Sequence, residues 1–142
     1  MPNWVEGKIV IRGKNKNLIR FLSDGLVSLD PDDLEIKTGD GVYRMITDNG
    51  FEIIGTTKHF VNIYGDIIEV PLDNDNDVVV SMSLEADRIN AEELLMIAKL
   101  FNIDFRAVAT HLKWEFTQHV LIMNGNVVKD ETININIFEF NN

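Results

Sequence analysis

The three histidines are the residues of this sequence best suited to hold a metal ion. His111 and His119 lie in the stretches "FRAVATHL" and "FTQHVLIM", which we expect to form neighbouring strands, and Glu115 lies between them. Two imidazoles and a carboxylate are ligands that zinc prefers, if they converge. One hypothesis is therefore a zinc-binding protein or metal-dependent enzyme that uses His59, His111, His119 and nearby carboxylates. The alternative is three unconnected histidines on the surface or in the core.

The stretch "PDDLEIK" (31–37) contains the residue types that hold Mg²⁺ in a large class of nucleases. In those enzymes the Asp and the Glu-x-Lys lie on adjacent strands, which requires a hairpin between them. Here only two residues separate Asp32 from Glu35. This spacing favours a solvated loop.

The stretch "DNDND" (73–77) has carboxylates at alternate positions, as a calcium-binding loop does. The sixth position of such a loop is glycine and the twelfth is a bidentate glutamate, but these positions are Val78 and Leu84 here. The pattern therefore indicates a polar turn between two strands.

The remaining catalytic patterns are absent from the sequence. It contains no cysteine, which excludes disulfides and cysteine nucleophiles. No serine lies in a Gly-x-Ser-x-Gly turn, and "GDGVYR" (39–44) has Arg44 where a nucleotide-binding motif has its third glycine. We therefore expect a protein that is not an enzyme and that has no cofactor, the zinc hypothesis excepted.

The charge of the chain is acidic and unevenly distributed. The formal net charge is −10; residues 1–23 carry five basic and one acidic residue, and residues 24–142 carry eight basic and 22 acidic residues. Such a domain does not bind a nucleic acid directly over a broad surface. It can be attracted to a protein with a basic nucleic-acid-binding groove, because opposite fields steer association. The alternative is that the acidity only maintains solubility.

The hydrophobic pattern predicts strands more often than helices. We expect a strand at Val5–Ile11, a short helix capped by Asn15 or Asn17, and a long loop with brief extended pieces at 24–50. Strand-like stretches follow up to residue 84, and then a helix at Ala91–Phe101 with Asn90 as its cap. A strand and a C-terminal hairpin around Asn124-Gly125 complete the chain.

This order of elements predicts an α+β fold with a ferredoxin-like split β-α-β core. Two helices would cover one face of a mainly antiparallel sheet, and the C-terminal hairpin would extend it. The length of 142 residues, with 45% hydrophobic and 25% charged residues, is typical of a single globular domain spanning 1–142. No apolar run approaches the ~18 residues that span a bilayer, and no secretory signal is visible, so we expect a cytoplasmic protein.

The opening "MPNWVEGKIVIRG", followed by "NLIRFL", resembles the small hypothetical proteins of bacteriophages and mobile elements that begin Met-Pro-Asn-Trp. The resemblance extends to "GTTKHFVNIYG" and to "FNIDFRAVATHLKWEFTQHVLIMNGNVVKDETI", and it is absent from 24–38. It implies a ferredoxin-like fold and a phage accessory protein that acts in the host cytoplasm.

The resemblance and the acidic charge together lead to a functional hypothesis. The protein would inhibit a host defence system, in the manner of an anti-CRISPR protein, by occupying a basic nucleic-acid-binding surface of the effector nuclease. The expected partner-binding residues are the carboxylates of two acidic loops: Asp30, Asp32, Asp33, Glu35 and Asp40, and Asp73, Asp75 and Asp77. The alternative function is the zinc site of His111, His119 and Glu115.

Overall fold

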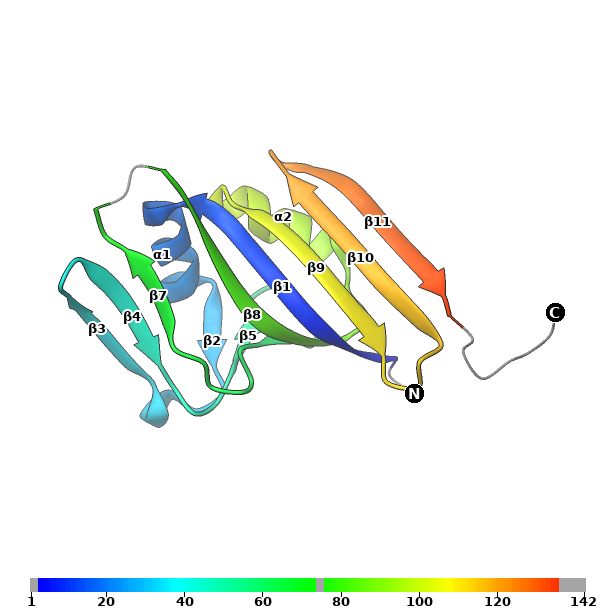
Figure 1. Cartoon of the computed structure of the whole chain (residues 1–142), viewed down its shortest axis with the longest axis horizontal. Helices are drawn as coiled ribbons and strands as arrows, with labels where there is room; N and C mark the ends of the chain where they lie inside the picture. The colour runs from blue at the N-terminus through cyan, green and yellow to red at the C-terminus, as the bar shows by residue number, and fades with distance from the viewer. Residues whose placement is uncertain (1–2, 74–75, 136–142) are drawn as a thin grey trace.

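The computed structural model describes residues 3–73 and 76–135, which form two antiparallel sheets and two α-helices (Figure 1). The large sheet consists of eight strands, β1 (Trp4–Lys14), β2 (Leu26–Ser28), β5 (Phe51–Ile53), β6 (His59–Val61), β8 (Asp77–Asp87), β9 (Asp104–His111), β10 (Phe116–Met123) and β11 (Asn126–Asn134). Their order across the sheet is β11-β10-β9-β1-β8-β6-β5-β2. The small sheet has the order β3-β4-β7 and consists of β3 (Glu35–Gly39), β4 (Val42–Ile46) and β7 (Ile68–Pro71).

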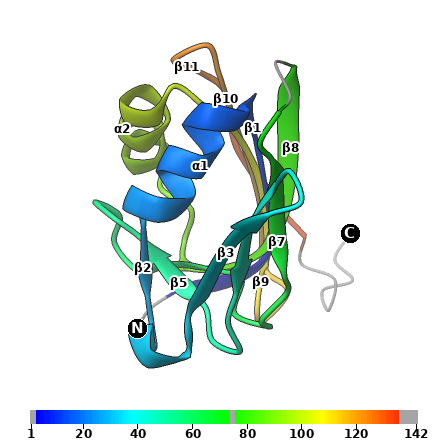
Figure 2. The same ribbon diagram turned by 90° about the vertical axis from the view of Figure 1, so that its left-hand side faces the viewer.

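Strand β1 lies in the middle of the large sheet and pairs along its whole length with β8 and over most of its length with β9. Its side chains alternate between the two faces, as the sequence predicts: Val5, Ile9 and Ile11 are fully buried, whereas Glu6 and Lys8 are exposed. Both helices pack on the buried face (Figure 2). The other face therefore carries the alternate residues of every long strand.

The predicted ferredoxin-like core is wrong. Of the described residues, 53% lie in strands and 18% in helices, and the eleven strands that they form make two sheets. A split β-α-β unit leaves room for one strand between its two parallel strands. Strands β8 and β9 do lie on either side of β1, but three strands (β8, β6 and β5) separate β1 from β2, the strand that follows the first helix. The inserted strands and the second sheet distinguish this fold from the predicted one.

The small sheet arises mainly from the region in which the sequence predicted a long loop. Residues 24–50 form β2, a short 3₁₀ helix (Pro31–Asp33), β3 and β4. All five residues of β3 are exposed, so the strand has no apolar face that sequence periodicity could reveal. The hairpin of β3 and β4 turns at Asp40 and Gly41, both of which have positive φ.

The two helices are α1 (Asn15–Asp24) and α2 (Ala91–Phe101), and α2 has the predicted bounds. The Asn90 side chain accepts a hydrogen bond from the Glu93 backbone N–H at 3.1 Å, as expected for a capping residue. At the start of α1 the cap position is Lys14, which makes no side-chain cap. Asn15 is buried instead and donates to the carbonyl groups of Pro71 and Leu72, which joins α1 to the end of β7.

The hydrophobic core lies between the helices and the large sheet. The ring of Phe21 on α1 makes edge-to-face contacts with Phe101 at 5.5 Å and with Phe105 at 5.7 Å between ring centroids. The small sheet contributes Met45 and Val70 to the same buried cluster. The helices and both sheets therefore share one core, and the outer face of the large sheet lies on the opposite side from it.

Candidate functional site: the open face of the large sheet

The face of the large sheet that points away from the helices, here called the open face, presents its side chains in cross-strand rows. One row consists of Ser81, Val10, Arg106, Leu121 and Lys129, taken from β8, β1, β9, β10 and β11 in turn. Figure 1 views the sheet from this side, with α2 behind β9 and β10. From Val10 to Lys129, apolar and cationic side chains alternate along this row, whereas the chain as a whole is acidic.

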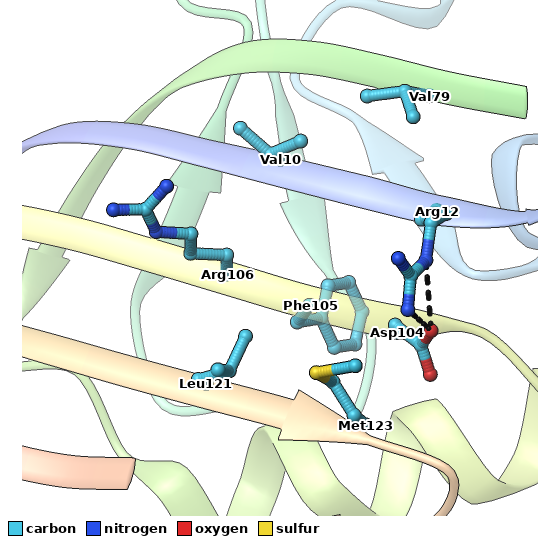
Figure 3. Close-up of a pocket in the computed structure, with 8 residues that line it drawn as sticks. All are labelled: Val10, Arg12, Val79, Asp104, Phe105, Arg106, Leu121 and Met123. Atoms are coloured by element: carbon cyan, nitrogen blue, oxygen red, sulfur yellow. Dashed lines mark hydrogen bonds and ion pairs between the residues drawn. The ribbon is translucent and has the colours of Figure 1, made fainter. Parts of the chain in front are cut away.

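A groove with an apolar lining lies on the open face, with a volume of 220 Å³ (Figure 3). Its lining comes from two neighbouring rows and from Phe105 of β9, whose ring lies on the helix side of the sheet. Five of its residues are apolar and three are charged: Val10, Val79, Phe105, Leu121, Met123, Arg12, Asp104 and Arg106. Val79 is 60% exposed at its rim. The groove can therefore accept an apolar group from solvent.

At one end of the groove Arg12 is held by Asp104 on the neighbouring strand. The guanidinium donates to Asp104 Oδ2 from Nη2 at 2.8 Å and from Nε at 3.1 Å, and this hydrogen bonding raises the pKa of Arg12. Asp104 Oδ1 in turn accepts the Asn124 backbone N–H at the turn between β10 and β11. The charge of Arg12 is thus compensated within the protein, and the pair fixes one wall of the groove.

Arg106, at the other end, has no such carboxylate partner among the described residues. Its Nε–H donates to His119 Nε2 at 3.3 Å. Burial, with the nearby charges of Lys129 and Arg106, lowers the pKa of His119, so the imidazole is neutral and accepts this bond. The two Nη groups of Arg106 remain available, and a guanidinium fork binds a carboxylate or phosphate through two parallel hydrogen bonds.

An aromatic and acidic group occupies the end of the open face near the N-terminus. Trp4 is half-buried and packs against Phe60, with 6.2 Å between ring centroids. Glu6 and Glu85 lie directly opposite each other on β1 and β8. Burial, with a smaller effect of Glu6, raises the pKa of Glu85. This end of the face is therefore acidic, in contrast to the groove.

The first of the two predicted acidic loops is divided by β3. Asp30, Asp32, Asp33 and Glu35 lie before and at the start of β3, whereas Asp40 lies in the turn after it. At about 3.3 Å per residue, Asp33 and Asp40 are ~20 Å apart along an extended chain. Asp73 and Asp77 lie on either side of the connection between β7 and β8, and Asp75 lies outside the described residues.

One of these carboxylates has a local structural role. Asp33 Oδ2 accepts hydrogen bonds from the Thr47 hydroxyl at 2.7 Å, the Asp48 backbone N–H at 2.6 Å and the Asn49 amide at 3.2 Å. These bonds, that of Thr47 above all, lower the pKa of Asp33. Asp33 therefore fixes the loop between β4 and β5, which leaves it less available to a partner.

The predicted zinc ligands point to opposite faces of the sheet. His111 is buried on the helix side, where it stacks on Phe116 with 4.6 Å between ring centroids, whereas His119 lies on the open face beside Arg106. Glu115 Oε2 lies 3.9 Å from His111 Nδ1. The sheet thus separates His119 from the other two residues. In the described ranges, no group of three or more histidines and carboxylates could hold a metal ion.

The third histidine joins a loop to the second helix. His59 is buried; its Nδ1 bonds the Thr57 carbonyl at 2.9 Å, and its Nε2 accepts the Asn90 backbone N–H at 3.0 Å. These two contacts require a neutral imidazole with the proton on Nδ1. Burial lowers the pKa of His59 in agreement with this state. His59 therefore orients the N-terminus of α2.

Sequence reasoning did not identify the open face because its cations are distant from one another in the sequence. Arg12 belongs to β1, and Arg106 comes from a strand 94 positions later in the sequence. The signal that was available is the alternation within "EGKIVIRGK", which puts Lys8, Val10 and Arg12 on one face.

No protein-family model, no curated protein and no solved structure matches this chain. Neither of the two described helices has the length and apolar character needed to cross a membrane.

Proposed function

We propose that this protein is a non-catalytic binding protein that docks a protein partner on the open face of its large sheet. The groove between Arg12 and Arg106 is the observation that carries this proposal. Its volume of 220 Å³ is below the roughly 300–1,000 Å³ of typical small-molecule sites, so it suits one or two apolar side chains of a larger partner.

The charges around the groove favour an acidic partner segment. Four basic residues (Lys8, Arg12, Arg106 and Lys129) and two acidic ones (Asp104 and Glu131) occupy the three rows that include the groove. A partner that presents a leucine or phenylalanine next to a carboxylate would place the apolar group on the floor and the carboxylate on the Arg106 fork. Apolar anchors beside an arginine are typical of the residues that dominate interface energetics.

A second candidate function is the acidic inhibitor of a host defence nuclease. It is favoured by the charge of residues 30–73, which contain three basic and ten acidic residues, a net charge of −7. Asp32, Glu35, Asp40 and Asp73 in this region are exposed. Here the small sheet, and not the open face, would contact a basic surface of the partner.

Affinity capture with three baits distinguishes the two functions. The baits are the wild type, Arg106→Glu, and the double variant Asp40→Lys/Asp73→Lys, whose substitutions lie at exposed positions. For docking on the open face, we expect a partner that the wild type and the lysine variant retain and that Arg106→Glu loses. A partner lost only by the lysine variant would favour the acidic inhibitor. Partners retained equally by all three baits would contradict both proposals.

A further inference from the structure

Strand β11 is the longest free edge of the two sheets in the part of the chain that the structure describes. It is the last strand of the large sheet, has nine residues, contains no proline, and is exposed at every position (Figure 1). The other three edge strands are shorter: β2 has three residues, β3 has five, and β7 has four and ends in Pro71. An exposed edge presents unpaired backbone groups to which another strand can add.

The charges of β11 are complementary to those of a second β11 strand. In antiparallel pairing about a two-fold axis at Asp130, Lys129 of each copy lies opposite Glu131 of the other. Both residues lie on the open side, because they pair with Leu121 and His119 of β10. The flanking pair, Val128 with Thr132, joins two β-branched residues, which favour strands.

Charge selects this register over its neighbours. Side chains in a strand repeat every two residues, so the symmetric alternatives place the axis at Lys129 or at Glu131. Each of the three registers puts one pair of identical charges at its axis, which is destabilising, but only the register at Asp130 adds two pairs of opposite charge, Lys129 with Glu131. The charged residues of β11 also discourage pairing with unrelated strands.

We propose that two copies of this chain associate through β11 and continue the large sheet across a two-fold axis at Asp130. Because the axis is perpendicular to the sheet, the open faces of the two copies lie on the same side. The contact is narrow compared with a standard interface, so the dimer is weak and depends on concentration. This inference does not depend on the proposed function.

Sedimentation of the full chain over a wide concentration range tests the dimer. The wild type is expected to change from monomer to dimer as concentration rises. Lys129→Glu replaces both attractive pairs with repulsive ones, and so does Glu131→Lys, so each variant should raise the dissociation constant by about tenfold or more. Both positions are exposed, and circular dichroism is the control that checks whether the variants are folded.

Mixing the two variants gives the most specific result. The Lys129→Glu chain carries two glutamates and the Glu131→Lys chain carries two lysines, so the mixture should form a heterodimer with near wild-type affinity. Asp130→Asn should tighten the wild-type dimer about two- to fivefold, because it removes the one like-charge pair at the axis. A wild type that stays monomeric at all concentrations, or variants that neither weaken the dimer nor restore it on mixing, would overturn the proposal.

Discussion

The small sheet and the open face of the large sheet carry opposite kinds of surface on one chain. Residues 30–73, which include all three strands of the small sheet, have a net charge of −7. The groove of the open face has an apolar floor between two arginines. A total charge of −10 therefore describes neither region, because strand alternation brings cations that are distant in sequence onto one face.

The two regions also differ in how they use their charges. In the small sheet Arg44 pairs with Glu69 on the neighbouring strand and Lys37 lies near Glu35, and beside it Asp33 accepts hydrogen bonds from the loop between β4 and β5. On the open face Asp104 compensates Arg12, but Arg106 is bonded only to a neutral histidine among the described residues. Arg106 is thus the better candidate for contact with a partner.

The largest expected change in stability comes from a substitution on the helix side of the large sheet, compared with one on its open face. Ile9→Ala removes a fully buried side chain from the helix side and should lower the free energy of unfolding by about 2–5 kcal/mol. Val79→Ala on the open face should change it by no more than about 0.5 kcal/mol. Urea denaturation measures both. Equal costs would mean that the open face is covered in solution.

A smaller loss of stability is expected when His59 is replaced. Replacing it with alanine leaves the Asn90 N–H without its acceptor, at a cost of about 1–3 kcal/mol. Because the folded pKa is lowered, the unfolded chain binds the proton more readily, and wild-type stability should fall as pH decreases below about 6.5. Denaturation at several pH values, with His59→Ala as the control, should show a smaller decrease in the variant. An unchanged pH dependence would exclude the neutral His59 contact.

A still smaller loss of stability is expected in the small-sheet region, where it distinguishes a carboxylate that accepts hydrogen bonds from a loop from one that does not. Asp33→Asn should destabilise the protein at neutral pH, whereas Asp32→Asn should not, because Asp33 bonds the loop at Thr47–Asn49. The pKa of Asp33 is lowered, so its contribution is present above the ordinary carboxyl pKa and disappears as pH falls through the folded value. Thermal melts in neutral and strongly acidic buffer measure the difference. Equal behaviour of the two variants would make Asp33 an unconstrained surface charge.

The sequence predicted the elements whose signals are local. Helix α2 has both a cap at Asn90 and an apolar period, and the turn at Asn124-Gly125 has positive φ at both residues, as the predicted hairpin requires. The small sheet was missed because β3 has no buried face. The strand order depends on pairings such as β1 with β8, which join residues more than 60 positions apart.

The candidate site was harder to predict for the same reason. His111 and His119 lie on opposite faces because Thr110 pairs with Thr117, and this register cannot be derived from the spacing of the histidines. Which face of the sheet remains open depends on where α1 and α2 cross it. Sequence alternation divides the residues into two sets but does not say which set the helices cover.

The most direct test of the open face as the binding surface is a methyl NMR titration. The probes are acetylated peptides with one glutamate beside a leucine or phenylalanine, and matched peptides with lysine in place of glutamate. We predict that the glutamate peptides shift the methyl signals of Val10, Val79, Leu121 and Met123, and that Arg106→Glu abolishes these shifts while Asp40→Lys does not. Glutamate peptides that leave the groove signals unchanged, with lysine peptides that shift the signals of the small sheet, would exclude the open face as the binding surface.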